Sequence, residues 1–219
     1  MKNFIVAFAF LGVLLGAITM GDPRQDSNAL QVATGLLLPV PDGYCALSAD
    51  DGEGGSLFKK SRFRVATANV QAITYFAECD QLELWREKRQ AIDRFGVYSA
   101  VRGEFSAPSI TRGEFLAAMA EYLSERKTMK LKDAITRIRG GIGVVELGLI
   151  HKDEGAAYSA VLLAGPEGGE AVQVHITAYT KSKDFQYVLH LSAPFENQIT
   201  IRDMVAIQKQ SIDLILDGH

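Results

Sequence analysis

Four strand-like runs in the second half of the chain constrain the fold more than any other feature. They span residues 144–151, 157–164, 172–180 and 185–193. The segments that separate them, KDEG, GPEGGE and KSKD, are short and either polar or rich in glycine. Such connections indicate hairpins, because tight polar loops join neighbouring antiparallel strands. The runs therefore predict an antiparallel meander.

Helical patterns lie apart from these runs. Thr111 and Glu114 form a capping-box pattern ahead of FLAAMAEYL, and a further helical stretch spans residues 131–139. Thr200 and Asp203 form a second capping-box pattern, which predicts that a long C-terminal helix begins there. The apolar stripe of that helix consists of Ile201, Met204, Val205, Ile212 and Ile215.

The first half of the chain mixes both patterns. It predicts strands over 35–40, 70–79 and 95–101, a helix over 56–69, and a short helix that begins at Asp80. Helices segregated from a run of strands are typical of α+β proteins. We therefore predict an α+β fold, an antiparallel sheet meander with helices packed on it, in layers like those of an α/β/α sandwich.

The N-terminus has the layout of a secretory signal peptide. Residues 4–20 carry no charge, one lysine precedes them, and small residues followed by a polar segment come after them. We predict a signal peptide over 1–21, a flexible lead over 22–33 and a single globular α+β domain over 34–219. The alternative is an uncleaved N-terminal anchor, because an apolar run of this length is at the lower limit for a spanning helix.

Cys45 and Cys79 are the two cysteines of the chain. In an oxidising compartment such a pair predicts a disulfide, which would stabilise the fold by roughly 3–4 kcal/mol. The alternatives are two buried thiols, or a metal pair, which the sequence does not support with a CxxC motif. We predict a periplasmic or secreted location, or a membrane-anchored one facing the periplasm if the leader is retained.

Two histidines lie in the last two strand-like runs. If the turn is centred on Ser182 and Lys183, His175 faces His190 directly, with Cβ atoms roughly 4.5–5.5 Å apart. The alternate residues of both runs are apolar and should face the core, so we predict that the histidines lie on an exposed polar face. Two imidazolium ions would repel each other, so one histidine should titrate below the usual pKa of about 6.5.

His175 and His190 are also the candidate metal ligands. A zinc site needs three or four ligands, and only two are supplied for certain; the pattern does not place His151 on the same face. No GxSxG, P-loop, HExxH or CxxC motif occurs. Gly140-Gly141-Ile142-Gly143 follows a helix instead of preceding one, so we interpret it as a helix stop. We predict no catalytic residues, no cofactor and no metal.

The charge pattern limits the partners. A formal net charge of -3 gives no general basic character, so we predict no nucleic-acid partner. One basic stretch, at 59–64, lies in the predicted helix over 56–69. A second stretch begins with Arg126, Lys127, Lys130 and Lys132, which could contact anionic head groups weakly. The alternative is a helix face that is simply solvated.

Three segments carry a resemblance to known proteins. The pieces LPVPDGYCAL, FAECDQLELWR and LSAPFENQ with QKQSIDLIL resemble those of a group of uncharacterised exported proteins of Gram-negative bacteria. The order of elements also resembles the fold shared by the photosystem II extrinsic subunit P and a Ran-binding nuclear import factor. That resemblance implies a central antiparallel sheet between helices, and roles in docking or scaffolding without catalytic residues.

Two functions follow as hypotheses. The first is a non-catalytic envelope protein that binds an unknown envelope protein or ligand, or assists assembly. The second is a periplasmic hydrolase or other enzyme whose site is dispersed in the sequence. A deep pocket with converging acidic or histidine side chains would favour the enzyme, and a flat surface with an exposed apolar patch would favour the binding module.

Overall fold

The computed structural model describes residues 38–47, 70–101, 110–127, 129–139, 143–164, 172–182 and 185–217. The predicted signal peptide, the flexible lead, the helix over 56–69 and the first half of the strand over 35–40 lie outside these ranges. Residues 38–40 are described and are not in a strand, which corrects that prediction: the first strand is Tyr44–Ala46. In the described ranges, no helix combines the length and the apolar character that crossing a membrane requires.

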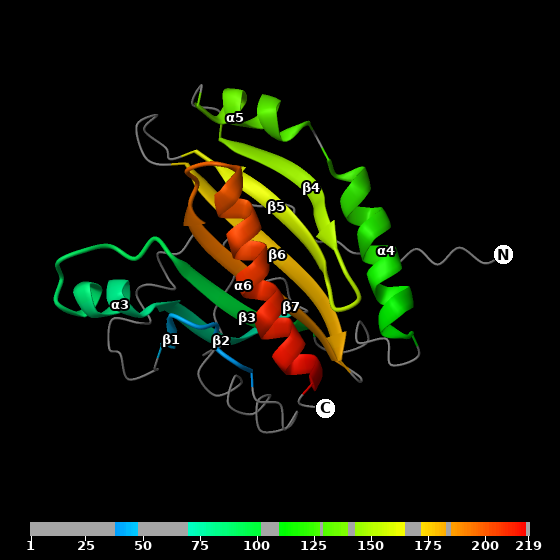
Figure 1. Ribbon diagram of the computed structural model, residues 1–219, viewed down its shortest axis with the longest axis horizontal. Helices are drawn as coiled ribbons and strands as arrows, with labels where there is room; N and C mark the ends of the chain where they lie inside the picture. The colour runs from blue at the N-terminus through cyan, green and yellow to red at the C-terminus, as the bar shows by residue number, and fades with distance from the viewer. Residues whose placement is uncertain are drawn as a thin grey trace, which may run out of the picture.

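The protein is an α+β fold built on one antiparallel sheet of seven strands, with four helices among the described residues packed on it (Figure 1). The strand order is β1-β2-β3-β7-β6-β5-β4, so the last four strands form the predicted meander. In chain order the elements are β1 (Tyr44–Ala46), β2 (Val70–Glu78), α3 (Cys79–Arg86), β3 (Phe95–Val101), α4 (Arg112–Glu125), α5 (Leu131–Arg139), β4 (Val144–Lys152), β5 (Ala157–Leu163), β6 (Gln173–Ser182), β7 (Phe185–Pro194) and α6 (Gln198–Asp217).

One face of the sheet is apolar and forms the main core. Val174, Ile176 and Ala178 of β6 are fully buried there. Helix α6 lies across this face (Figure 1) and buries Ile201, Met204, Ile212 and Ile215 in the same cluster. Helix α5 adds Ala134 and Ile138 to it. Every second side chain along these strands therefore lies under a helix, as the sequence pattern predicts.

Helix α4 packs on the opposite face. Its stripe of Phe115, Met119 and Leu123 is buried in a second, smaller cluster that includes Ala157 of β5. The predicted capping box begins this helix: Thr111 Oγ1 accepts from the Glu114 amide at 3.2 Å, and the Glu114 carboxylate accepts from the Thr111 amide at 2.7 Å. Helices thus cover both faces, as in the predicted layered arrangement.

The start of α6 corrects a sequence prediction. The helix begins at Gln198, two residues ahead of the expected capping residue, Thr200. The Asn197 side-chain oxygen accepts from the Ile199 amide at 2.7 Å, so Asn197 satisfies a free amide of the first turn. Thr200 Oγ1 instead accepts from the Glu196 amide, at 3.4 Å. Asn is a strong N-terminal capping residue, which explains why it is preferred over the later Thr-x-x-Asp pattern.

The predicted disulfide is present. Cys45 in β1 and Cys79 at the start of α3 have Cα atoms 5.0 Å apart, across 34 positions of the sequence. β1 is one of the two edge strands of the described sheet and has three residues, so three backbone pairs with β2 hold it. The disulfide therefore joins a short edge strand covalently to the β2–α3 junction.

Gly148 lets the second helical layer approach the sheet. It has a φ of +65° and lies at a β-bulge, between Glu146 and Gly148 in the pairing of β4 with β5. A Cβ atom there would lie 2.9 Å from the Lys127 amide nitrogen and 2.5 Å from the Leu123 carbonyl oxygen. Both neighbours are backbone atoms at the end of α4, so they cannot move aside as a flexible side chain could.

Replacing Gly148 with alanine should lower the free energy of unfolding by about 2–5 kcal/mol, because strain at positive φ adds to the overlap with α4. Gly143 is the matched control, since a Cβ atom there meets nothing within 4 Å. Urea unfolding followed by circular dichroism measures both variants. Equal midpoints for the two variants would contradict the close contact between β4 and α4.

Candidate functional site

The two histidines share a face of the sheet, but they are not directly opposite. Thr177 pairs with His190, and His175 pairs with Ser192, so the predicted register is wrong by two residues. The reason is the turn: Ser182 pairs with Phe185, which moves the connection one position along the chain. A shift of two keeps every side chain on its predicted face. His175 and His190 are therefore diagonal neighbours, with Cα atoms roughly 7–8 Å apart.

The histidine face is buried, which corrects the expectation of an exposed polar face. His175 is 7% exposed, and Ser99, Ser192 and Gln186 on the same face are 0%, 3% and 2% exposed. The His190 Nδ1 atom lies 2.9 Å from Thr177 Oγ1, which fixes the imidazole against the neighbouring strand. Among the described elements, α4 contacts this side of β4, β5 and β6.

Burial keeps both imidazoles neutral. Desolvation lowers the pKa of His175 to about 3, and the positive charge of a protonated His190 adds to the effect. Desolvation also lowers the pKa of His190, to about 4. The sequence predicted that mutual repulsion would lower one value; burial is instead the main cause, and it lowers both.

The histidine pair could supply two nitrogen ligands to a metal. The described part of the chain contains no group of three or more His, Cys, Asp or Glu side chains that could hold a metal ion. His151 pairs with Tyr158, whose side chain belongs to the main core, so it lies on the opposite side of the sheet. The candidate metal site thus stays at two ligands.

A second polar group lies where α4 meets the histidine face. The Arg126 guanidinium binds both oxygens of Glu146, at 2.9 Å each, and donates to the Tyr122 hydroxyl at 2.8 Å. The Glu146 bond raises the pKa of Arg126 further. A cavity of about 30 Å³ lies beside this pair, lined also by Ser159 and Tyr179. It has room for about one water molecule, so Arg126 is engaged within the protein.

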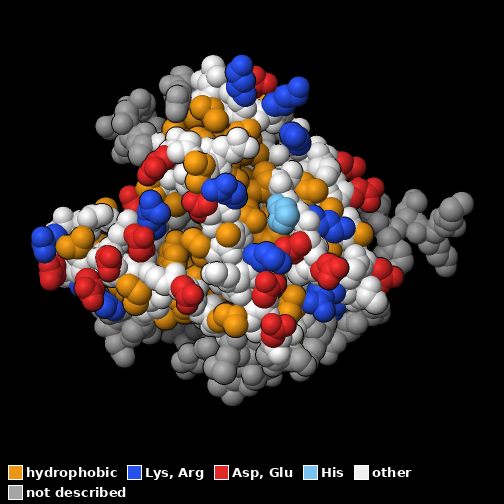
Figure 2. Space-filling model, viewed as in Figure 1, with side chains coloured by type: hydrophobic (Ala, Val, Ile, Leu, Met, Phe, Trp, Pro, Cys, Tyr) orange, Lys and Arg blue, Asp and Glu red, His pale blue; other side chains and the backbone are white. Residues whose placement is uncertain are grey.

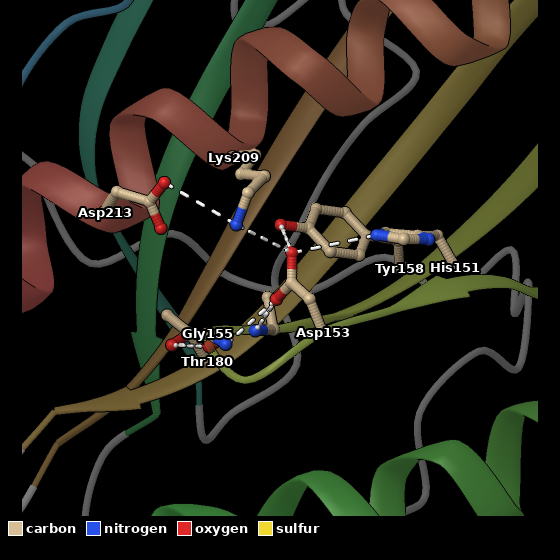
Figure 3. Close-up of polar contacts among 8 residues, drawn as sticks. His151, Asp153, Gly155, Tyr158, Thr180, Lys209 and Asp213 are labelled. Atoms are coloured by element: carbon tan, nitrogen blue, oxygen red, sulfur yellow. Dashed lines mark hydrogen bonds and ion pairs between the residues drawn. The ribbon is translucent and has the colours of Figure 1, made fainter.

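The third group surrounds Asp153 on the α6 side, at the turn between β4 and β5 (Figure 3). Asp153 Oδ1 accepts from the amides of Gly155 and Ala156, at 2.9 and 2.8 Å. Its Oδ2 lies 3.2 Å from the Lys209 ammonium of α6 and 3.7 Å from His151 Nε2. These contacts join the hairpin turn to the helix.

The electrostatics of Asp153 agree with this structural role. Burial opposes its ionisation, but the Ala156 amide and the Lys209 ammonium outweigh that cost, so the pKa of Asp153 lies below its ordinary value. Lys209 also lies 3.6 Å from Asp213, one turn further along α6. The carboxylate is therefore ionised and occupied by donors, which leaves little of its basicity for proton transfer.

Sequence reasoning did not identify this Asp153 group. Its members come from β4, β5 and α6, and Lys209 is 56 positions from Asp153. One local signal was present, because an aspartate in the KDEG connection can accept from amides two and three residues ahead. Nothing in the pattern of α6 marks Lys209 as its partner.

The fold and these groups define an α+β protein with one disulfide-linked antiparallel sheet and polar groups that are largely paired internally. No protein-family model matches the sequence, and no curated protein is significantly similar to it. The structure is similar to that of LpqN, described as involved in cell envelope biogenesis of Mycobacterium tuberculosis, with 14% identity, a TM-score of 0.33 and 78% of each chain covered. A likeness this slight supports no inference about function, and the resemblance to exported proteins of Gram-negative bacteria stays a prediction.

Two substitutions at Asp153 separate its two roles. Asparagine keeps an oxygen for the Gly155 and Ala156 amides but loses the ion pair with Lys209, so it should cost about 1 kcal/mol or less. Alanine also removes both amide bonds and should cost about 2–3 kcal/mol. Thermal unfolding at neutral pH measures the difference, and equal losses would contradict the turn-forming role of the carboxylate.

The buried histidines make stability depend on pH. The pKa values of about 3 for His175 and about 4 for His190 lie below the unfolded value of about 6.5, so below that pH protons bind preferentially to the unfolded chain. The free energy of unfolding should therefore fall as the pH drops from about 6.5 toward 4, by about 4 kcal/mol by pH 5 for the pair.

Urea titrations at pH 7.5 and pH 5 measure this effect. The loss should shrink in a variant with His175→Gln and His190→Gln, and it should persist in His151→Gln, whose side chain is 48% exposed. Two buried imidazoles that titrate near 6.5 by NMR would show that the histidine face is solvated.

Proposed function

We propose that this protein is a non-catalytic binding or assembly module of the cell envelope, located in the periplasm or secreted. The disulfide between Cys45 and Cys79 supports a place outside the cytoplasm, because such bonds persist mainly in oxidising compartments. The signal-peptide layout of residues 1–21 supports the same location.

The observation that supports a non-catalytic role is the pairing and protonation of the titratable groups. Arg126 is bound to Glu146, and Asp153 to Lys209, so these charges stabilise the fold. The buried imidazoles of His175 and His190 have pKa values of about 3 and 4. A general base works best with a pKa near the working pH, so neither imidazole is suited to that role near neutrality.

The dimensions of the described cavity also favour surface binding. Its volume of about 30 Å³ is far below the roughly 300–1,000 Å³ of typical small-molecule pockets. Large apolar side chains meanwhile lie at the surface: Val144 and Ile199 are 54% exposed and Leu214 is 59% exposed. These three side chains are scattered, so it is the small volume of the cavity that supports binding at the surface over a substrate enclosed there.

The alternative is a periplasmic hydrolase or other enzyme with a dispersed site. The observation that favours it is the pairing of His151 with Asp153, at 3.7 Å, on a half-exposed surface beside Tyr158. A histidine held near a carboxylate can act as a base when a nucleophile or water lies within reach. Replacing His151 therefore distinguishes the two functions, because only an enzyme that uses this histidine would lose turnover.

Crosslinking in the native envelope, followed by mass spectrometry, tests the proposal. We expect a protein partner that is recovered reproducibly, and that is absent when an unrelated exported protein of similar size is crosslinked in parallel. The purified protein is tested against a panel of ester, peptide and glycoside substrates, with His151→Ala as the matched variant. Turnover that His151→Ala abolishes would establish the enzyme instead.

A further inference from the structure

The stretch from residue 126 to residue 139 concentrates positive charge. It contains six Lys or Arg residues and a single acidic one, Asp133, in a chain whose formal net charge is -3. The remainder of the protein is therefore clearly acidic. A local excess of this size, against an acidic background, indicates a surface with a specific electrostatic role.

The structure describes the side chains of five of these six cations, and they fall into two sets. Arg126 is held by Glu146 and Tyr122, as described above. Four others are exposed at the end of α4, on α5 and between them: Lys127, Lys130, Lys132 and Arg137. We call these four residues the basic surface.

Helix α5 is amphipathic, and this directs the basic surface outward. Ala134 and Ile138 are 0% and 2% exposed in the main core, which fixes the opposite side of the helix toward solvent. Lys132 and Arg137 occupy that solvent side, with Asp133 as the acidic residue among them. Lys132 and Arg137 are thus held by a packed helix, and Lys127 and Lys130 lie in the short connection that leads from α4 into it.

Apolar side chains lie next to these cations. Val144, the first residue of β4, is 54% exposed, and β4 packs against α5. Met129 and Leu131 are partly buried at the start of α5. Figure 2 shows Lys and Arg side chains beside hydrophobic ones over α5, at the upper end of the view.

From this combination we propose that the basic surface docks on the anionic head groups of a phospholipid bilayer, with Val144 reaching the boundary of the acyl chains. The proposal deepens the proposed function, and rests on it for the envelope location. A lipid interface interacts favourably with both kinds of side chain, since its anionic phosphates attract lysines while apolar side chains are buried below the phosphates. A nucleic acid would attract the cations but would offer no apolar environment for Val144.

The strength expected from four cations is modest. Each lysine or arginine near an anionic membrane contributes about fivefold in partitioning, and this attraction is screened by salt. The surface would therefore hold the protein reversibly at a membrane, and orient its sheet relative to that membrane, without anchoring it.

Vesicle flotation tests the proposal with the protein in the form recovered from cells. The measured quantity is the ratio of binding to vesicles of 30% phosphatidylglycerol in phosphatidylcholine over binding to pure phosphatidylcholine, so any contribution of the N-terminal apolar segment cancels. We expect a ratio well above one, which falls as salt increases. A variant with Lys127→Gln, Lys130→Gln and Lys132→Gln should lower the ratio by roughly 100-fold. If the wild-type ratio is itself below about 100, the variant should bring the ratio down to one.

The matched control removes the same charge elsewhere. Arg89→Gln, Arg112→Gln and Arg202→Gln neutralise three exposed cations that lie after α3, at the start of α4 and in α6, and should leave the ratio nearly unchanged. Val144→Gln should weaken binding to the anionic vesicles and leave binding to a soluble polyanion, heparin, unaltered. If both triple variants lower the binding ratio equally, or if the wild-type ratio is one, the proposal that the basic surface docks on anionic lipid is wrong. Either result would leave the crosslinking test of the envelope function unaffected.

Discussion

The burial of the apolar face of β6 and β7 under α6 is the interaction on which the rest of the structure depends. These strands are the last two of the meander, and β7 is the middle strand of the sheet; Leu189 and Leu191 of β7 are each 1% exposed. At about 1.5–3 kcal/mol for each large buried side chain, this face supplies much of the driving force for folding. Gln208 orients α6 on this face of the sheet. Its buried side-chain amide donates to the Ile176 and Leu189 carbonyls at 3.0 and 2.8 Å.

The opposite face of the same strands carries a different chemistry, because a strand presents alternate side chains to its two sides. Once α6 has fixed which set is inward, the other set, with His175, Thr177 and His190, must lie toward α4. There it is buried beside neutral hydroxyl and amide groups, and the imidazoles lose their basicity. The low pKa values of the two imidazoles thus follow from the packing that holds the fold together.

The sequence contained enough to predict the faces of the sheet but not its pairing. The alternation of apolar residues in 172–180 and 185–193 is unchanged when one strand slides by two positions, so it could not distinguish His190 opposite His175 from His190 opposite Thr177. The turn decides between them, and its position differed by one residue from the one expected. The strands from β2 onward, α4 with its capping box and the cysteine pair depend on local signals, and these were predicted correctly. The first strand was not: residues 38–40 are not in a strand, and β1 lies further along, at Tyr44–Ala46. The first turn of α6 was not, because Asn197 and Thr200 offered competing local caps.

The polar contacts between residues that are distant in the sequence could not be predicted from the sequence alone. The turn made by Asp153 is local, but its ion pair with Lys209 exists only because α6 returns across the sheet after 56 positions. Arg126 shows the opposite case, because the sequence placed it in a continuous basic stretch, whereas the fold pairs its half-buried side chain with Glu146. Charge counted along a chain therefore overstates the charge available to a partner. What remains after such pairing, four exposed cations beside an exposed valine, is a smaller set than the sequence suggested but a better defined one.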